Sequence, residues 1–308
     1  MPLERHARQA KLRAMETSFA FNDSLVRFSI FAGLLVLFAL LELAWPRRQL
    51  IVSKGRRWFT NVGMGALTGL LMRFIATLAV PLTAVAAAFY AQQNQLGLLN
   101  NVDWPQWLKI LIVLAVLDLA IWAQHLASHK IPVLWRIHRV HHADRDIDVT
   151  TAIRFHPIEI VLSMLWKIAV VVPLGASPFA VFLFEAILNG CAMFNHSNIN
   201  LPRPLDRVLR LFIVTPDMHR VHHSVFRPEH DSNYGFNLSI WDRIFRTYTA
   251  QPKDGHLGMR IGLDSFQTAA PTQLGWSLWL PFKREASMDD EAQREPPEYA
   301  ARSTETLR

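Results

Sequence analysis

The chain of 308 residues is 51% hydrophobic and carries a formal net charge of +7. Its apolar residues come in long blocks, which argues against a water-soluble core and indicates an integral membrane protein. The Lys and Arg residues stand in short clusters beside these blocks, a pattern of membrane anchoring that argues against nucleic-acid binding. The single cysteine, Cys191, excludes an intramolecular disulfide and a thiolate metal cluster.

The N-terminal third predicts a membrane anchor. Residues 1–24 are polar and basic, and residues 25–104 predict anchor helices with their loops. The apolar run 25–45 is long enough to span a bilayer of about 30 Å. We expect no cleavable signal peptide before it, so that the run stays in the mature protein. The block 60–91 is longer than the ~20 residues that one span needs, and we expect it to be tilted or bent near Pro81.

Three further apolar segments lie in residues 105–250, which we predict to form one domain. They are 105–124, 157–172 and 178–194, and a turn containing Pro and Gly separates the last two. As helices, these two are only about 24–26 Å long, so we expect short membrane legs. The sequence therefore predicts an all-α integral membrane protein with four to five membrane helices.

Loop charges predict the orientation. The loop 92–104 has no Lys or Arg, whereas 46–59 has several. The positive-inside rule then places 46–59 and the histidine-rich segments on the cytoplasmic side, where we expect a helical cap. This order of spans puts the N-terminus outside, which conflicts with the basic residues of 1–24 and leaves the side of that end open.

The C-terminal region divides into two parts. Residues 251–282 are predicted to be an interfacial segment, because Gly275–Phe282 is aromatic and apolar but too short to span a bilayer. Residues 283–308 are charged and contain paired prolines, so we predict that they are disordered.

Ten of the thirteen histidines lie between His125 and His223. Among them are one H-x-x-x-H and two copies of H-R-V-H-H. A single H-x-x-H-H is expected by chance only about 0.02 times per chain. Positions i, i+3 and i+4 share one helix face, so each H-R-V-H-H presents a cluster of imidazoles. We predict that all ten bind metal: His125, His129, His138, His141, His142, His156, His196, His219, His222 and His223.

The number of histidines predicts two metal ions. A structural zinc takes four ligands and a catalytic zinc takes three plus water, so one ion would leave most of the set unused. Two ions with about five nitrogens each would use it. Imidazole suits iron, zinc and copper, and the ligand type alone leaves the metal open.

Two carboxylates inside apolar segments are candidates for supporting these ligands. Asp118 lies seven residues before His125, and Glu185 lies eleven residues before His196, so each pair shares a helix face. Acidic groups within a span are costly and are therefore functional candidates. We expect Asp118 and Glu185 to accept hydrogen bonds from the outer nitrogens of bound imidazoles.

The histidine motifs resemble the three boxes of the fatty acid hydroxylase / sterol desaturase superfamily, H-x(3,4)-H, H-x-x-H-H and H-x-x-H-H. The matching segments are His125–His129, His138–His142 and His219–His223. Four longer stretches are similar to its bacterial branch: 150–157, 195–202, 215–224 and 233–248. The resemblance covers residues 105–250. The same family pattern implies His156 and His196 as further ligands, and it leaves open whether His156 completes the set.

The resemblance implies a non-haem di-iron oxidoreductase that uses dioxygen to hydroxylate or desaturate a fatty acyl chain, a sterol or a sterol-like lipid. Zinc could substitute for the two iron ions. Electrons would come from a separate donor of cytochrome or ferredoxin type. The expected location is the bacterial inner membrane, with the metal site on the cytoplasmic side.

Two other functions stay open. A zinc-dependent membrane hydrolase is disfavoured because the sequence has no H-E-x-x-H motif. A non-enzymatic metal transporter or electron-transfer protein is disfavoured because transporters place their ligands near the bilayer midplane, whereas these histidines are predicted on one side. The oligomeric state is not indicated by the sequence.

Overall fold

The computed structural model describes residues 25–78 and 83–283, and in this part of the chain all regular elements are helices. Four helices are long and apolar enough to cross a membrane, as judged by length and composition: Leu25–Ala44, α4 (Gln106–Lys130), α6 (Pro157–Leu174) and α7 (Pro178–His196). The prediction of an all-α integral membrane protein with four to five membrane helices is confirmed. The expectations for residues 1–24, 284–308 and the bend at Pro81 lie outside the described residues.

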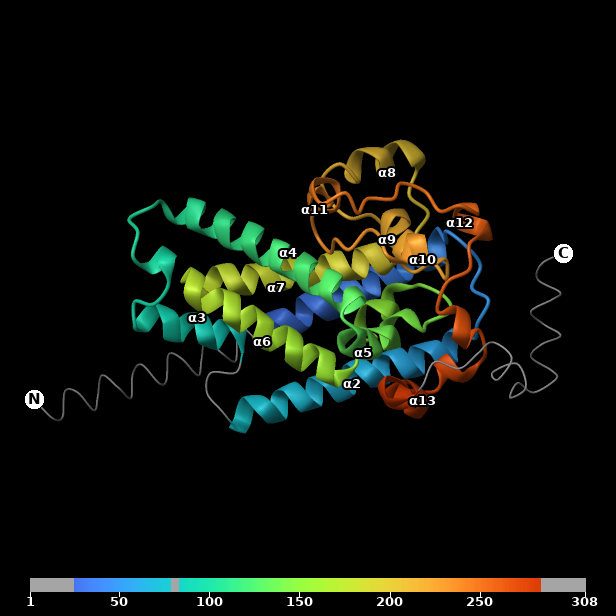
Figure 1. The fold of residues 1–308 in the computed structure, drawn as a ribbon, viewed down its shortest axis with the longest axis horizontal. Helices are drawn as coiled ribbons and strands as arrows, with labels where there is room; N and C mark the ends of the chain where they lie inside the picture. The colour runs from blue at the N-terminus through green and yellow to red at the C-terminus, as the bar shows by residue number, and fades with distance from the viewer. Residues whose placement is uncertain (1–24, 79–82, 284–308) are drawn as a thin grey trace, which may run out of the picture.

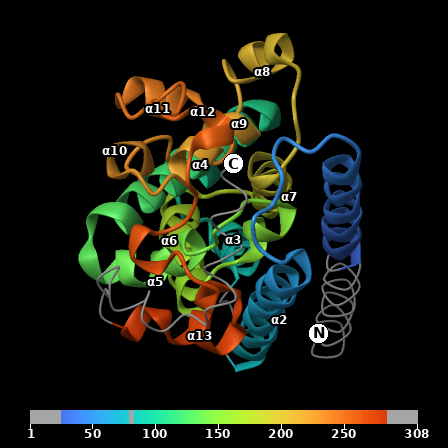
Figure 2. The same ribbon diagram turned by 90° about the vertical axis from the view of Figure 1, so that its right-hand side faces the viewer.

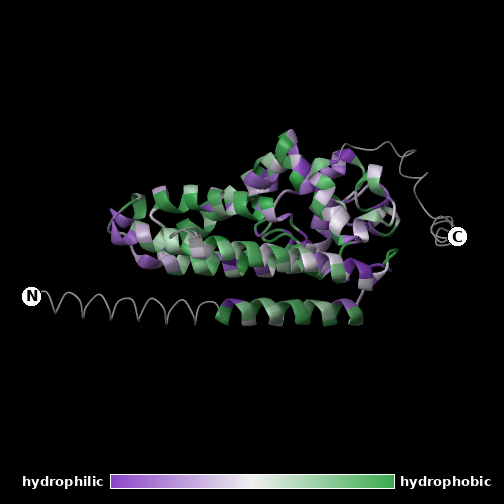
Figure 3. Cartoon of the chain, turned by 90° about the horizontal axis from the view of Figure 1, so that it is seen from below, coloured by the Kyte–Doolittle hydropathy of each residue, from purple (hydrophilic) through white to green (hydrophobic). Residues whose placement is uncertain are grey.

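The membrane helices form a bundle at one end of the molecule, and short helices form a cap at the other (Figure 1). In the bundle, α4, α6 and α7 pack against one another and against α3 (Ala84–Gln93). The helix Leu25–Ala44 lies along one side as a separate layer (Figures 2 and 3), with Phe31, Leu34 and Phe38 packed near Ala192 and Met193 of α7.

The remaining elements are short apart from α2. They are α2 (Lys54–Leu78), η1 (Leu98–Asn100), α5 (Pro132–His142), η2 (Val149–Ile153), α8 (Arg203–Leu209), α9 (Pro216–His222), α10 (Arg227–His230), α11 (Ile240–Ile244), α12 (Gly255–Gly258), η3 (Asp264–Phe266), η4 (Ala270–Thr272), α13 (Leu274–Trp279) and η5 (Leu280–Phe282). The block that the sequence predicted as one bent span thus contains two helices, α2 and α3. Neither is among the four candidate membrane helices.

The predicted turn between the last two membrane helices is present, and its residues explain it. Gly175 ends α6 with a φ of 70°, and Ser177 caps α7 by accepting a hydrogen bond from the amide of Ala180. A Cβ on Gly97 would lie 2.2 Å from the amide nitrogen of Gly175, so the two loops approach too closely for a side chain. Because α6 and α7 leave and return on the same side, their histidine-bearing ends meet the cap.

Buried charges fasten α2 to the cap. Arg57 is 0% exposed and donates to both Asp144, at 2.7 and 2.8 Å, and Asp148, at 2.6 Å. Asn61 donates to Asp144 at 3.0 Å and accepts a hydrogen bond from Arg154 at 2.8 Å. Burial alone would raise the pKa of Asp144, but the charge of Arg57 outweighs it and holds the pKa at about 2. The loop after α5 is therefore held by compensated charges in addition to the apolar packing of Ile147 and Val149.

The C-terminal segment that the sequence predicted as interfacial packs on α2 and α5. Leu280 and Leu274 join Met64 of α2 and Val140 of α5 in one apolar cluster, and Trp276 lies edge-on to Phe266 with 5.3 Å between ring centroids. This contact places the segment directly beside the helix that carries the first H-R-V-H-H.

Candidate metal centre

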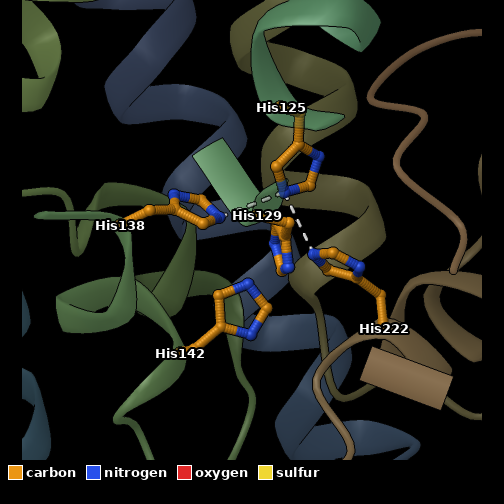
Figure 4. Close-up of side chains that lie close together, drawn as sticks. All are labelled: His125, His129, His138, His142 and His222. Carbon is orange, nitrogen blue, oxygen red and sulfur yellow. Dashed lines mark hydrogen bonds between the residues drawn. The ribbon is translucent and has the colours of Figure 1, made fainter. Parts of the chain in front are cut away.

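Nine of the ten predicted histidines converge at the junction of bundle and cap, and they form two groups. Group one consists of His125, His129, His138, His142 and His222 (Figure 4). Group two consists of His141, His196, His219 and His223. In each group, one nitrogen of every ring lies within 4.8 Å of one nitrogen of every other, and all nine side chains are buried. Each group could hold a metal ion.

Four helices deliver these rings. The last two turns of α4 carry His125 and His129, α7 ends at His196, and α5 and α9 carry the two H-R-V-H-H segments. In α5 the neighbours His141 and His142 belong to different groups, and His222 and His223 divide in the same way. Successive helical residues differ by about 100° in direction, so each pentapeptide supplies both groups.

The backbone fixes the tautomers in group one. Nδ1 of His125 lies 2.7 Å from the carbonyl oxygen of Tyr234, and Nδ1 of His222 lies 2.7 Å from that of Ser232. A carbonyl oxygen can only accept, so each Nδ1 carries the proton and each Nε2 of the neutral ring presents a lone pair. Nδ1 of His138 likewise donates to the Glu159 carboxylate at 2.6 Å.

These lone pairs face one another. Nε2 of His125 is 3.0 Å from Nε2 of His222 and 3.1 Å from Nε2 of His138. In group two, Nδ1 of His196 donates to the Ala192 carbonyl at 2.7 Å, and its Nε2 lies 3.0 Å from Nε2 of both His141 and His219. Facing lone pairs repel unless a cation lies between them. Two ligands at right angles on a metal about 2.1 Å away are about 3.0 Å apart, so the donor set fits two metal ions.

Buried nitrogens without a partner support the same conclusion. Neither ring nitrogen of His129 or His142 makes a hydrogen bond to any described residue, although both rings are buried. Buried polar groups are nearly always satisfied, and an orphan needs an explanation such as an ion. Bound metal would supply it.

Five histidines of the two H-R-V-H-H segments favour the neutral form that metal ligands need. Burial, reinforced by the neighbouring imidazoles, lowers the pKa of His141, His142, His219, His222 and His223 well below the ordinary histidine value. The neutral imidazole is the form that binds metal.

An apolar cavity of about 700 Å³ lies between the helix Leu25–Ala44, α2, α4, α6 and α7 and reaches group one. His125, His138 and Glu159 form its polar wall at that end, and apolar side chains such as Ile121 and Phe155 form most of the rest. Among the described residues that line it there is no member of group two. The volume is in the range that holds one small ligand.

The structure does not bring His156 into either group. It caps α6 instead: its Nδ1 accepts a hydrogen bond from the amide of Ile158 at 3.2 Å, and its Nε2 lies 3.2 Å from the carbonyl oxygen of Leu278. Pro157 occupies the first helical position, where proline is favoured.

The two carboxylates expected to support the ligands have other partners. Asp118 accepts from the indole of Trp241 at 2.8 Å and from the amide of Leu238 at 3.2 Å. Glu185 accepts from Lys167 and Arg27, each at 2.7 Å. Among the described residues, neither carboxylate makes a hydrogen bond to an imidazole. Sharing a helix face does not bring together residues that lie about 10–16 Å apart along the axis.

Three residues near the centre were not predicted. Glu159 takes the supporting role, and His230 and Asp231 form a further close set with His129. The His230 ring centroid is 4.8 Å from that of His129 and 4.5 Å from that of His142. His230 ends α10 and stands outside any H-x-x-H-H spacing in the sequence, so only tertiary packing brings it to the centre.

Comparison with known proteins agrees with this geometry. Ornithine lipid hydroxylase OlsE of Rhizobium tropici is 31% identical over 58% of this chain and 50% of its own length. Alkylglycerol monooxygenase of Xenopus tropicalis is 29% identical over 71% of this chain and 48% of its own. Cholesterol 25-hydroxylase of Mus musculus is 26% identical over 46% and 47%.

The chain thus spans about half the length of these curated relatives. No solved structure matches it. Residues 110–247 match the family described as fatty acid hydroxylase, and this segment contains all nine clustered histidines. This segment of the chain is therefore similar to the fatty acid hydroxylase family.

Proposed function

We propose that the protein is a membrane-bound oxidoreductase that uses dioxygen and two iron ions to oxidise a C–H bond of a lipid. The observation that carries the proposal is the apolar cavity that ends on His125 and His138 of group one. A lipid chain in this cavity would lie against the metal ligands. The hydroxylase and monooxygenase names of the relatives favour hydroxylation over desaturation.

The two histidine groups would hold the ions. Imidazole suits iron, and zinc could occupy the same ligands. When bound, the iron pair would supply the activation of dioxygen. Hydroxylation consumes R–H, dioxygen, two electrons and two protons and yields R–OH and water, so the protein needs an electron donor. We propose a separate donor of cytochrome or ferredoxin type.

The protein's own side chains would orient and protect the centre. Glu159 and the carbonyls of Tyr234 and Ser232 fix three imidazoles of group one, which raises their basicity toward metal. The apolar walls around Ile121 and Phe155 would exclude water from the reacting carbon. The side chains of the protein would therefore orient the metal ligands and keep water out of the cavity.

We propose the bacterial inner membrane as the location, with the metal centre on the cytoplasmic side. The basic cluster after the helix Leu25–Ala44 lies at the cap, where Arg47 pairs with Asp217 and Arg48 donates to the carbonyl of Met259. By the positive-inside rule, a basic cluster at the cap favours a cytoplasmic cap.

The test is metal analysis of the purified protein combined with dioxygen-dependent turnover of extracted membrane lipids. Iron near two per chain, with an oxygenated lipid formed only in the presence of dioxygen and reductant, is the expected result. Zinc with lipid hydrolysis would show a hydrolase instead. Metal-free protein without turnover would refute both.

A further inference from the structure

Charged side chains stand inside the apolar bundle, away from the histidines. Lys167 of α6 donates to Glu185 of α7 at 2.7 Å, and Arg27 binds the other oxygen of Glu185 at 2.7 Å. Both Lys167 and the neighbouring Asn189 line the cavity that reaches group one. Ionisable groups within a membrane span are costly and mark a functional site by default.

Residue spacing along α6 and α7 gives the distance from Lys167 and Asn189 to the metal ligands. Glu159, Ser163 and Lys167 follow one another at four-residue spacing on α6, and all three line the cavity. Glu159 contacts His138, so Lys167 lies two turns deeper, about 12 Å along the helix. On α7, Asn189 precedes His196 by seven residues, about 10 Å. Since His196 belongs to group two, the α6 spacing is the one that gives the distance to group one.

The hydrogen-bond donors of Lys167 favour a ligand that has an acceptor atom. Lys167 has three N–H donors and gives one to Glu185, whose other oxygen is occupied by Arg27. Among the described residues, no second acceptor is within hydrogen-bond distance of the Lys167 ammonium. The other walls are mainly apolar, so a ligand oxygen is the natural partner for the remaining donors.

We propose that Lys167 and Asn189 form a polar subsite that binds an oxygen acceptor of an otherwise apolar lipid. The subsite would hold the carbon about 12 Å from that oxygen against group one. This inference rests on the proposed function and deepens it. The substrate is then a long lipid with a hydroxyl, carbonyl or carboxylate oxygen, and the distance from that oxygen decides which carbon is oxidised.

The direct test is probe binding to the purified full chain in detergent, which requires no turnover. The probes are radiolabelled hexadecan-1-ol, hexadecanoate and hexadecane, which share one chain length. Wild type should bind an oxygen-bearing probe at least about tenfold more tightly than the alkane, as one hydrogen bond to a charged donor implies. The stronger of the two oxygen probes identifies a hydroxyl or a carboxylate ligand.

Substitutions test whether Lys167 and Asn189 cause the tighter binding of the oxygen-bearing probe. Lys167→Met should reduce the preference to within about twofold, while Lys167→Arg should retain it. Lys109→Met is the control, because Lys109 lies on α4 but does not line the cavity. Asn189→Leu leaves the ion pair intact and should weaken the preference if Lys167→Met does not fold. Wild type without a preference, or a preference unchanged in Lys167→Met and Asn189→Leu, would overturn the proposal.

A second readout separates this inference from the proposed function. With reductant and dioxygen, wild type should oxidise one carbon at a fixed distance from the substrate oxygen, and Lys167→Met should spread oxidation over neighbouring carbons. Failure of wild type to oxidise any lipid would refute the proposed function and leave the binding result standing. Oxidation at the same single carbon in both proteins would refute the subsite alone.

Discussion

Both histidine groups take rings from the two H-R-V-H-H segments, but the two groups have different surroundings. Group one has five rings, and His125 and His138 face the apolar cavity. Group two has four rings, and none of them is among the described residues that line the cavity. Instead, His141 stacks on Phe155 with 4.3 Å between ring centroids. One ion would therefore lie beside the lipid and the other behind it.

The outer nitrogens differ as well. In group one, His125, His138 and His222 donate to a carbonyl or carboxylate. In group two only His196 does so, since Nδ1 of His141, His219 and His223 has no partner among the described residues. The two sites thus differ although both take rings from the H-R-V-H-H segments, because the neighbouring segments decide how firmly each ring is held.

The largest expected effect tests the division into two groups. His141→Ala leaves group two with three rings, and His222→Ala leaves group one with four. Both should abolish turnover and lower the metal content while the protein stays in the membrane, and the loss of metal should be greater for His141→Ala because fewer ligands remain. Metal analysis of detergent-purified variants measures this. Full occupancy in both variants would remove these residues from the ligand set.

The sequence predicted the helical class and most of the histidine cluster, because spacing along a helix determines which rings share a face. It did not separate His156 from the ligands, although Pro157 directly after it was a helix-start signal. Nor did it find Glu159 as the partner of His138, since that contact joins two helices.

Helical periodicity gives the direction of a side chain but not its contact partner, and this explains the difference at Asp118. Periodicity correctly places Asp118 on the face of His125, yet the carboxylate binds Trp241 and Leu238. Which residue of a distant segment fills the space beside it depends on tertiary packing. For the same reason the sequence could not show that Lys167 and Glu185 meet inside the bundle.

Arg57→Leu should disturb both histidine groups equally, because Arg57 anchors the loop after α5 and α5 carries rings of both groups. Removing Arg57 takes away the cation that pairs with the buried carboxylates of Asp144 and Asp148, two and six residues after His142, which should cost about 3–5 kcal/mol of unfolding free energy. Denaturant unfolding in detergent measures it. Arg56→Leu is the matched control, since Arg56 is the exposed neighbour on α2. Equal stability of the two variants would contradict the anchoring role of Arg57.

Glu159→Leu should affect group one selectively. The outer nitrogen of His138 loses its acceptor, and metal retention should weaken roughly ten- to a hundredfold, as for other changes behind a metal ligand. Competition with a chelator measures the retention of each ion. Asp118→Asn is the comparison variant, because Asp118 contacts Trp241 and not an imidazole, and its metal retention should equal wild type. Weaker metal retention in Asp118→Asn than in Glu159→Leu would restore Asp118 as the residue that supports a metal-bound imidazole.

The smallest expected effect concerns His156, the one predicted ligand that lies outside both groups. Its Nδ1 accepts from the Ile158 amide and its Nε2 lies beside the Leu278 carbonyl, so neither nitrogen is left for a metal. His156→Ala removes the α6 cap and should lower stability by about 1 kcal/mol, whereas His156→Asn should recover most of it because Asn caps helices well. Both variants should keep the full metal content. Metal loss in both, with unfolding unchanged, would make His156 a ligand and add a donor to the centre.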